Sequence, residues 1–295
     1  MNGDGGVQEL YEQYKGLLFT LAYQLTGSTS DAEDVVQDVF LKIYEVDLEL
    51  VVEPKAYLCK MVTHRCWDLL KSARKKREQY FGPWLPEPIL TSNDESFEFV
   101  VRKEMLFYSM LVLLERLSLL ERAVFVLREA FGFEYSDIAE MINKSETNCR
   151  KMLSRAKVKI GITNEQQIHG DVASEAWVHR FITALEQNNV NAVVSMLAED
   201  VVLVSDGGGK VSAAVHPITS RDLVTRFLLG LVRKSAHEEE GIQVAIRELN
   251  GQTGVVIQTT QGVETVVLMH VEGDLLRHLY FVRNPEKLNH VLHHS

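Results

Sequence analysis

A short segment near the middle of the chain, ETNCRKMLSRAKVKIG (146–161), gathers Lys and Arg side chains at helical spacing. Such donors bind phosphates and base edges when a helix lies in the major groove of DNA. The apolar residues recur at i, i+3, i+4, i+7 and i+11, so they share one helical face and leave the polar residues on the other. The candidate DNA-contacting residues are Thr147, Asn148, Arg150, Lys151 and Arg155.

The residues before this segment supply the scaffold that a DNA-binding helix needs. A shorter predicted helix, capped by Ser136, would bury Ile138, Ala139 and Ile142. A tight turn at 143–145 follows, so the pattern is helix, turn, helix. The competing interpretation is a solvated amphipathic helix, which is the commoner fate of such a pattern. The two-helix context and the local excess of positive charge favour DNA.

Two kinds of DNA contact are expected from the basic helix. Lys151 and Arg155 are candidates for contacts with base edges or phosphates. Arg150, Lys157 and Lys159 are candidates for phosphate contacts, which position a protein on DNA without reading its sequence.

A second basic run ends another predicted helix, which starts at Pro54 and contains THRCWDLLKSARKKR (63–77). Aromatic rings interleaved with cations suit single-stranded or melting DNA, because bases stack on the rings. Trp67 is the candidate ring. The alternatives are that Trp67 is a core residue and that the cations only complement the negative end of the helix dipole.

An acidic surface is predicted closer to the N-terminus, in SDAEDVVQDVFLKIYE (30–45). Ser30 followed by Glu33 has the spacing of a capping box. One apolar stripe then runs through Ala32, Val35, Val36, Val39, Phe40 and Ile43. Carboxylates lie off this stripe, so the segment predicts an amphipathic helix with an acidic outer face.

The bulk composition limits the function classes. The chain has 295 residues, 46% hydrophobic and 24% charged, which is ordinary for two or three globular domains. Its three cysteines lack metal-ligand spacing, which favours reduced thiols in the cytoplasm and no metal site. No apolar run reaches the ~20 residues of a membrane span, and the N-terminus is not a signal peptide. A net charge of -10 argues against nucleic acid, but the local distribution of charge overrules this total.

Two segments with other patterns follow the predicted helices. The stretch GPWLPEPILTSNDESFE (82–98) contains three of the six prolines, which indicates an extended linker. Trp84 in this linker indicates that it docks on something, since flexible tethers rarely contain aromatic residues. From Ser174 onward, helices precede short alternating segments, and Asn250-Gly251 predicts a hairpin between two of them. This order is typical of an α+β domain.

Three stretches of the chain resemble parts of one known family. The stretches 11–45 and 54–77 resemble region 2 of extracytoplasmic-function sigma factors of the sigma-70 type, and 114–160 resembles their region 4. Together they cover somewhat more than half the chain. The resemblance implies partners, namely promoter DNA and the core of bacterial RNA polymerase, contacted at its beta-prime clamp and beta flap.

The resemblance also implies site residues. The residues that would bind the polymerase clamp are Asp31, Glu33, Asp34, Gln37 and Asp38. Those at the -10 promoter element would be Trp67, Asp68, Lys71 and Arg74. The helix from Thr147 to Lys159 would read the -35 element. His64 departs from the frequent Asn of the family, and Asn148-Cys149 replaces a frequent Thr-Val, so base preferences do not transfer.

The remainder of the chain resembles a narrower group of these sigma factors, whose members have a fused C-terminal SnoaL-like domain of the nuclear transport factor two-like fold. Three signatures carry this: WLPEP (84–88), DGGGK (206–210) and NPEKL (284–288). In that group the extension regulates the sigma factor in cis and replaces a separate anti-sigma partner. The implied regulatory contacts are Trp84, Leu85, Pro86, Asp206, Gly207, Gly208, Gly209, Lys210, Asn284 and Pro285.

The expected architecture is multi-domain. An all-α sigma region 2 (1–80), a linker (81–100) and an all-α region 4 with its helix–turn–helix (101–163) precede an α+β SnoaL-like domain (170–290). We expect a cytoplasmic sigma factor with no membrane contact, catalytic residue, cofactor or metal. One alternative is a ligand-sensing helix–turn–helix regulator that is not a sigma factor. A further one is a SnoaL-type isomerase or hydrolase that uses Asp206 with His216, His270 or His278.

Overall fold

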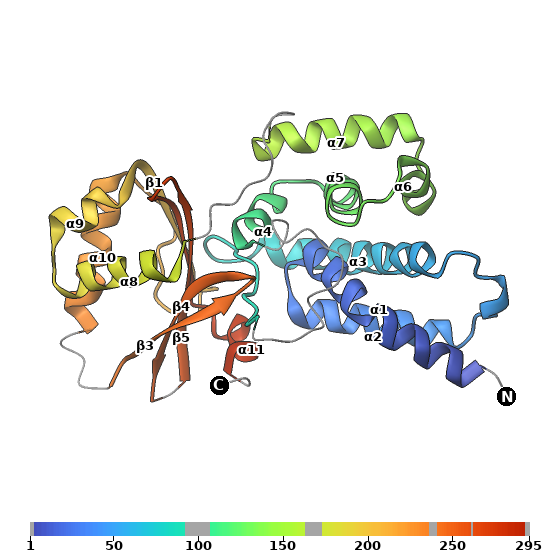
Figure 1. Cartoon of the computed structure of the whole chain (residues 1–295), viewed down its shortest axis with the longest axis horizontal. Coiled ribbons are helices and arrows are strands. Elements are labelled where there is room, and N and C mark those ends of the chain that lie inside the picture. The colour runs from blue at the N-terminus through green and yellow to red at the C-terminus, as the bar shows by residue number, and fades with distance from the viewer. Residues whose placement is uncertain (1–2, 92–106, 163–172, 236–240, 261, 293–295) are drawn as a thin grey trace. The chain divides into compact units, whose positions relative to one another are not determined.

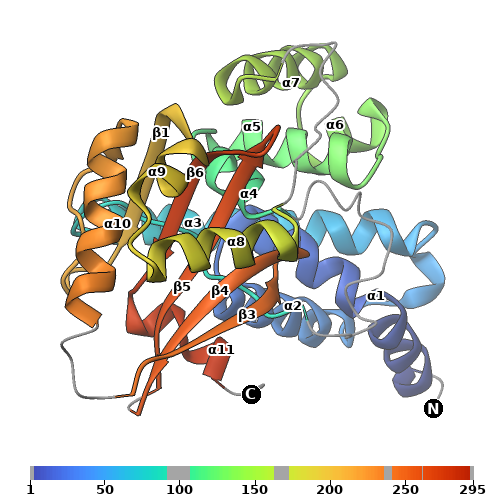
Figure 2. The ribbon, with the colours of Figure 1, turned by 60° about the vertical axis from the view of Figure 1, so that its left-hand side comes forward.

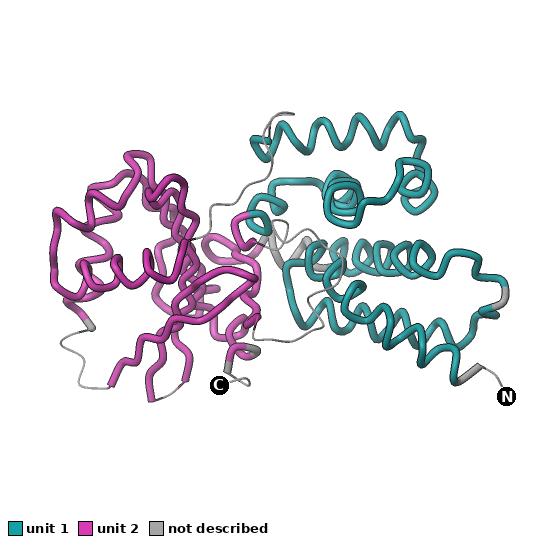
Figure 3. The backbone as a smooth tube through the Cα atoms, in the orientation of Figure 1, with its two compact units in different colours: residues 1–78, 93–106, 110–168 teal, residues 79–92, 107–109, 169–295 magenta. Residues whose placement is uncertain are grey.

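The computed structural model describes residues 3–91, 107–162, 173–235, 241–260 and 262–292 (Figure 1). It divides into two compact units (Figure 3). The first comprises residues 1–78, 93–106 and 110–168, and the second comprises 79–92, 107–109 and 169–295. The first part of the expected linker therefore belongs to the C-terminal unit. Among the described helices, none has the length and hydropathy that crossing a bilayer requires.

The first unit begins with three helices, α1 (Gly3–Thr26), α2 (Thr29–Ile43) and α3 (Pro54–Glu78), with a 3-10 turn at Leu48–Leu50. The apolar stripe predicted for α2 is buried throughout. The predicted cap is wrong, because α2 starts at Thr29 and Ser28 is its N-cap. The Ser28 hydroxyl accepts a hydrogen bond from the Asp31 amide at 3.3 Å.

Four more helices follow: α4 (Tyr108–Leu114), which enters this unit at Met110, and α5 (Leu119–Phe125), α6 (Tyr135–Ile142) and α7 (Glu146–Ile160). A π-helical turn, η4 (Val126–Ala130), continues α5. The predicted turn between α6 and α7 is confirmed, since Asn143 ends α6 in the left-handed conformation (φ 52°) and Ser145 caps α7. Ser136 does not cap α6, because the helix already begins at Tyr135 and the Ser136 hydroxyl bonds to Asp137 instead.

The second unit is built on a six-stranded sheet in the order β2-β1-β6-β5-β4-β3. The strands are β1 (Leu197–Asp206), β2 (Ile218–Thr219), β3 (Gln243–Leu249), β4 (Gln252–Thr259), β5 (Gly262–Glu272) and β6 (Leu275–Val282). Neighbouring strands are antiparallel except β1 and β6, which are parallel. Asn250 and Gly251 join β3 to β4, both with positive φ, as the hairpin signal predicts.

Helices cover one face of this sheet (Figure 2). They are α8 (Glu175–Glu186), α9 (Val190–Ser195) and α10 (Arg221–Ser235). A 3-10 turn, η5 (Pro285–Lys287), and the short helix α11 (Asn289–Leu292) end the described chain. The expected α+β architecture of the C-terminal half is therefore confirmed.

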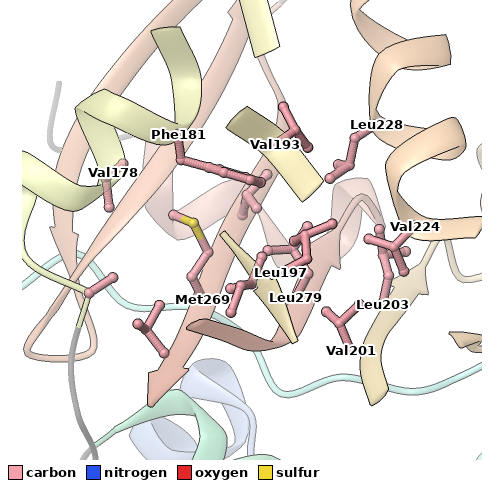
Figure 4. Packing of buried hydrophobic residues seen from close by; sticks show 14 of the residues in the cluster. Val178, Phe181, Val193, Leu197, Val201, Leu203, Val224, Leu228, Met269 and Leu279 are labelled. Carbon is pink, nitrogen blue, oxygen red and sulfur yellow. The ribbon is translucent and has the colours of Figure 1, made fainter. Parts of the chain in front are cut away.

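The core of the second unit lies between these helices and the sheet (Figure 4). Phe181 from α8, Leu228 from α10 and Leu279 from β6 are among its members, each at most 4% exposed. Their packing removes apolar surface from water and aligns the strands. The ends of β1 and β6 are thereby fixed, and these ends carry the polar residues described below.

Candidate functional site

The outer face of α2 carries the predicted acidic residues. Glu33, Asp34 and Gln37 are exposed, and Asp31 and Asp38 are half-buried. The Asp38 carboxylate accepts a hydrogen bond from Arg65 Nε on α3 at 2.6 Å, so its charge is already paired. Two apolar side chains that the sequence did not single out continue this surface. They are Leu41, 59% exposed, and Tyr44, 55% exposed. The face therefore combines carboxylates with apolar contact area.

The predicted -10 residues lie along α3. The Trp67 ring is 5.2 Å from the His64 ring, and its buried Nε1 atom has no hydrogen-bond partner among the described residues. Asp68 and Lys71 are exposed and bond to each other at 3.2 Å. The side chain of Arg74 lies outside the described part of the chain. Trp67 is thus half-buried at the surface of α3 and not a fully buried core residue.

The α7 helix places its predicted residues as the periodicity indicates. Cys149, Leu153, Ala156 and Ile160 are buried against the rest of the unit. All five predicted DNA-contacting residues lie on the exposed side: Thr147, Asn148, Arg150, Lys151 and Arg155. A helix held by one face with donors on the other has the form that major-groove binding requires.

Two lysines of α7 that were expected to contact phosphate have carboxylate partners within the first unit. Lys157 Nζ lies 3.0 Å from a carboxylate oxygen of Glu129, and Lys159 Nζ lies 2.6 Å from one of Glu121. Desolvation opposes ionisation of Glu121, but hydrogen bonds from Lys159 and Ser118 outweigh it and lower its pKa. Both lysines therefore hold α7 to the preceding helices. Their expected phosphate contacts stay a prediction.

Arg150 is positioned by an aromatic ring that the sequence did not reveal. Its guanidinium lies 4.1 Å from the centroid of the Tyr135 ring, and Arg128 lies 4.8 Å from the same centroid. Glu146 accepts a further hydrogen bond from Arg150 at 3.2 Å. Stacking on Tyr135, the first residue of α6, restricts the direction of the Arg150 guanidinium.

In the second unit, the linker docks on a buried carboxylate. Asp206, at the end of β1, is fully buried. Its oxygens accept hydrogen bonds from the Tyr80 hydroxyl at 2.6 Å, the Leu85 amide at 2.8 Å and the Gly208 amide at 3.0 Å. Lys287 Nζ lies 2.7 Å from the second oxygen. We call Tyr80, Leu85, Asp206, Asn284 and Lys287 the Asp206 cluster.

Lys287 supplies the opposite charge in this cluster. It is 5% exposed, donates to the Leu85 carbonyl, and lies 4.0 Å from the centroid of the Trp84 ring. Lys287 belongs to the NPEKL signature, but the regulatory contacts expected in that signature were Asn284 and Pro285. Its role could have been inferred from charge balance alone, since a buried Asp requires a cation or several donors. Tyr80, which precedes WLPEP by four residues, carried no such signal.

The remaining predicted residues surround the Asp206 cluster. Gly208 has φ +59°, and a Cβ atom there would lie 2.4 Å from Asn284 Nδ2, so only glycine fits. A Cβ on Gly207 would clash with the Val211 carbonyl, and Gly209 has φ +71°. Pro285 starts the turn η5, and Asn284 donates to the Tyr80 hydroxyl at 2.9 Å. Lys210 forms an exposed ion pair with Glu286, so the Lys210 ammonium already has a carboxylate partner within the protein.

The linker also extends the sheet. Leu90 forms a β-bridge with Leu249 at the end of β3. The Asn250 amide donates to the Ile89 carbonyl at 2.8 Å, and the Thr91 amide donates to the Glu248 carbonyl at 3.1 Å. Farther along the chain, the Tyr108 hydroxyl donates to the Pro86 carbonyl at 2.6 Å. The WLPEP segment is therefore bound by side chains and main chain of the C-terminal unit.

Comparisons with known proteins agree with these two sets of features. Residues 10–76 match the Sigma-70 region 2 family model, and residues 108–160 match the Sigma-70 region 4 model. The chain is 33% identical to the ECF RNA polymerase sigma factor SigJ of Mycobacterium tuberculosis, over 94% of this chain and 91% of that one. It is 31% identical to the probable ECF RNA polymerase sigma factor SigI of the same species, over 60% of each chain.

A solved structure is similar over nearly the whole chain. The crystal structure of Mycobacterium tuberculosis SigJ matches with a TM-score of 0.77 and 27% sequence identity, covering 95% of this chain and 97% of that one. The order of helical regions and C-terminal sheet is thus shared with a protein of that description.

Removing the carboxylate of Asp206 tests the cluster. Asp206→Ala leaves the Lys287 ammonium buried without its counter-charge, so we expect the free energy of unfolding to fall by ~3–5 kcal/mol. Glu286→Ala, which breaks the exposed pair with Lys210, should change it by no more than ~1 kcal/mol. Urea denaturation followed by circular dichroism measures both. Equal effects of the two variants would show that the buried pair has no special role.

Proposed function

This chain belongs to the ECF RNA polymerase sigma factors, and we propose that its region 2 binds the -10 element of a promoter while its region 4 reads the -35 element. The observation that carries this proposal is the α6–α7 pair, whose exposed polar face follows a separate helical region with an acidic surface. The alternative of a regulator that is not a sigma factor is not supported, because both sigma regions match in order.

In region 4, Lys151 and Arg155 are the proposed contacts with base edges or phosphates. Both are exposed at i and i+4 on α7, so they face the same side of the helix. Arg150 and the nearby Thr147 and Asn148 lie closer to the start of the helix. The stacked Arg150 guanidinium suits a phosphate contact, because its direction is fixed by Tyr135.

In region 2, the acidic face of α2 is the proposed contact with the polymerase clamp. Asp34 is exposed, and the apolar side chains of Leu41 and Tyr44 lie farther along the same helix. Charged groups steer the encounter of the two proteins, and apolar contact area slows their dissociation. Trp67, Asp68 and Lys71 are the proposed -10 residues on α3, together with Arg74. Trp67 Nε1, which has no hydrogen-bond partner within the described ranges, supports this role, because a buried donor without a partner is rare in protein interiors.

For the C-terminal unit, we propose a SnoaL-like regulatory domain that acts in cis through the linker. The Asp206 cluster supports this proposal, because it binds the segment that joins the two DNA-binding regions. Docking of the linker limits the distance that those two regions can span. Release of the linker should therefore favour promoter binding. We propose domain boundaries at 1–80, 101–163 and 170–290, and no requirement for a separate anti-sigma factor.

We also propose that the chain has no catalytic site of its own. The carboxylate considered for acid–base chemistry, Asp206, accepts hydrogen bonds from four donors and is fully buried. His270 and His278 alternate with core residues of β5 and β6 and contact each other's rings at 5.7 Å. These groups therefore serve the fold and the linker contact.

Reversing one charge on α2 tests the polymerase contact. Asp34→Lys should weaken binding to core RNA polymerase by tenfold or more, because like charges would then face each other. Glu199→Lys makes the same change on the C-terminal unit and should leave binding unaffected. Titration of core enzyme monitored by fluorescence anisotropy measures both affinities. Unchanged binding of Asp34→Lys would place the polymerase contact elsewhere.

Salt dependence distinguishes the two classes of lysine on α7. Lys151→Ala should reduce the log–log slope of DNA affinity against salt by about 0.9, since one phosphate contact is lost. Lys157→Ala should leave that slope unchanged and lower thermal stability, because its partner is Glu129. Binding of a -35 duplex between 50 and 200 mM salt provides the slopes. Identical slopes for both variants would contradict the assignment.

A conservative change in the cluster tests regulation in cis. Tyr80→Phe removes one hydrogen bond to Asp206 and the acceptor for Asn284, and so weakens linker docking. If docking restrains the DNA-binding regions, run-off transcription with core polymerase should rise several-fold, up to about tenfold for ~1.4 kcal/mol. Glu286→Gln is the matched control and should not change the yield. A yield that is unchanged or reduced for Tyr80→Phe would oppose an inhibitory role of docking.

A further inference from the structure

One aromatic side chain of the second unit is exposed although residues on both sides of it are anchored. Phe81 is 63% exposed, the largest exposed fraction of any Phe, Tyr or Trp among the residues that the structure describes. Tyr80 before it donates its hydroxyl to Asp206, and the Leu85 amide after it donates to the same carboxylate. The backbone on either side of Phe81 is therefore fixed, and its ring is still left in water.

The turn after β1 positions the Phe81 side chain. Gly209 in this turn has φ +71°, and a Cβ atom added to it would lie 3.1 Å from Phe81 Cβ and 3.6 Å from Phe81 Cγ. The Phe81 side chain therefore packs on the Gly209 backbone, and glycine suits both the left-handed conformation and this close approach. Gly82, which follows the ring, is also in the left-handed region, with φ +83°. This packing limits the directions that the ring can take.

The exposed ring is not part of a broad apolar surface. Val215, 44% exposed, lies beside Gly82, and Gly209 is followed by the charged side chain of Lys210. One ring and one valine provide far less area than the about 800 Å² per partner that a stable protein interface buries. Single exposed apolar side chains are common on protein surfaces. What distinguishes Phe81 is its fixed position and the charge of the chain before it.

A strongly basic stretch of chain leads to this ring. Residues 71–78, KSARKKRE, contain five Lys or Arg residues and one Glu, in a protein whose net charge is -10. They form the last turns of α3, which ends at Glu78, three residues before Phe81. Lys71 lies about 10 Å from the end of α3 along the helix axis, and three residues of chain span at most about 11 Å. Connectivity alone thus keeps the backbones of Lys71 and Phe81 within roughly 21 Å of each other.

Cations followed closely by an aromatic ring are a combination that binds single-stranded nucleic acid. The cations attract phosphates, and the ring stacks on a base whatever the identity of that base. The proposed function brings unpaired DNA to this stretch, because α3 carries the proposed -10 residues and the DNA strands must separate for initiation. An exposed ring that is held in place suits stacking, because little of its freedom is left to lose on binding.

We propose that Phe81 stacks on an unpaired base of promoter DNA, a few nucleotides from those that α3 contacts, so that the second unit contacts DNA directly. This rests on the proposed function, because it takes the -10 role of α3 as given. Gly209 of the DGGGK signature is the residue on which the ring packs. The contact between Phe81 and Gly209 does not include the WLPEP segment, so the ring can bind DNA whether that segment is docked or released.

Substitution of Phe81 tests the stacking in the complex of the full-length chain with core RNA polymerase. The probe is a fluorescent fork DNA from a promoter that the wild-type complex transcribes, with a duplex -35 element and a single-stranded -10 strand. Phe81→Ala should weaken binding of this DNA by about fivefold or more, which corresponds to the loss of one stacked base. Phe81→Trp keeps a ring and should bind as the wild type does. Fluorescence anisotropy measures these affinities.

A control variant accounts for the loss of exposed apolar area. Val190→Ala shortens a side chain that is 47% exposed at the start of α9, and it should leave DNA binding unchanged. Equal binding of the fork DNA by Phe81→Ala and the wild type would overturn the proposal. So would a loss of the same size for Val190→Ala.

An abasic scan identifies the stacked base. Each nucleotide of the single strand is replaced in turn by one that lacks its base. At one position this change should cost the wild-type complex about fivefold in affinity and the Phe81→Ala complex nothing, because the ring that the base stacks on is already absent. If the scan finds no position at which the two complexes differ, the proposal is wrong.

The affinity of Phe81→Ala for core polymerase without DNA separates a DNA contact from a protein contact. It should equal that of the wild type, and a loss there would assign Phe81 to the polymerase interface and overturn the proposal. Failure of the wild-type complex itself to bind any fork DNA would contradict the proposed function, and the stacking role with it. Binding by the wild type that Phe81→Ala leaves unchanged contradicts the stacking role alone.

Discussion

The buried carboxylate of Asp206 is the interaction on which the C-terminal unit depends. An ionised carboxylate is stable away from water only when charge and hydrogen bonds replace its hydration. Here the replacements come from three places in the sequence: the linker, the turn after β1 and the turn after β6. Loss of the turn after β6 would leave the Asp206 carboxylate without its counter-charge, and loss of the linker would remove two of its four donors. The sheet, the linker and the last described residues therefore form as one cooperative assembly, although they are separated by more than a hundred residues.

In the helical unit the buried charge is the Arg122 guanidinium, which bonds to carbonyl oxygens of both helical regions. Within each region, apolar side chains such as Val35 and Leu153 form the core, and their separation would expose hydrocarbon to water. Between the regions, His64 and Arg122 bond to the main-chain oxygens of Met141 and Leu25. Burial of apolar surface thus stabilises each region, and these directional bonds contribute to their mutual orientation.

Local patterns in the sequence predicted most of the secondary structure. The stripe of α2, the turn at Asn143 and the hairpin at Asn250 depend on neighbouring residues, so periodicity and turn chemistry were sufficient. The two misplaced caps, Ser30 and Ser136, are errors of one or two residues where several polar side chains compete. The fates of Lys157 and Lys159 were not predictable, because their carboxylate partners are 28 and 38 residues away. The same holds for Tyr80 and Arg122, whose partners are fixed only by tertiary packing.

The bridge between Leu90 and Leu249 has a consequence for the behaviour of the released linker. β3 is an edge strand of the sheet, and residues 89–91 cover the main-chain groups at its C-terminal end. An uncovered edge offers amides and carbonyls to any extended polypeptide. Undocking would therefore expose unpaired main-chain groups at this edge and favour strand exchange between molecules. We expect the undocked form to be short-lived in a crowded cell unless another surface covers the edge of β3.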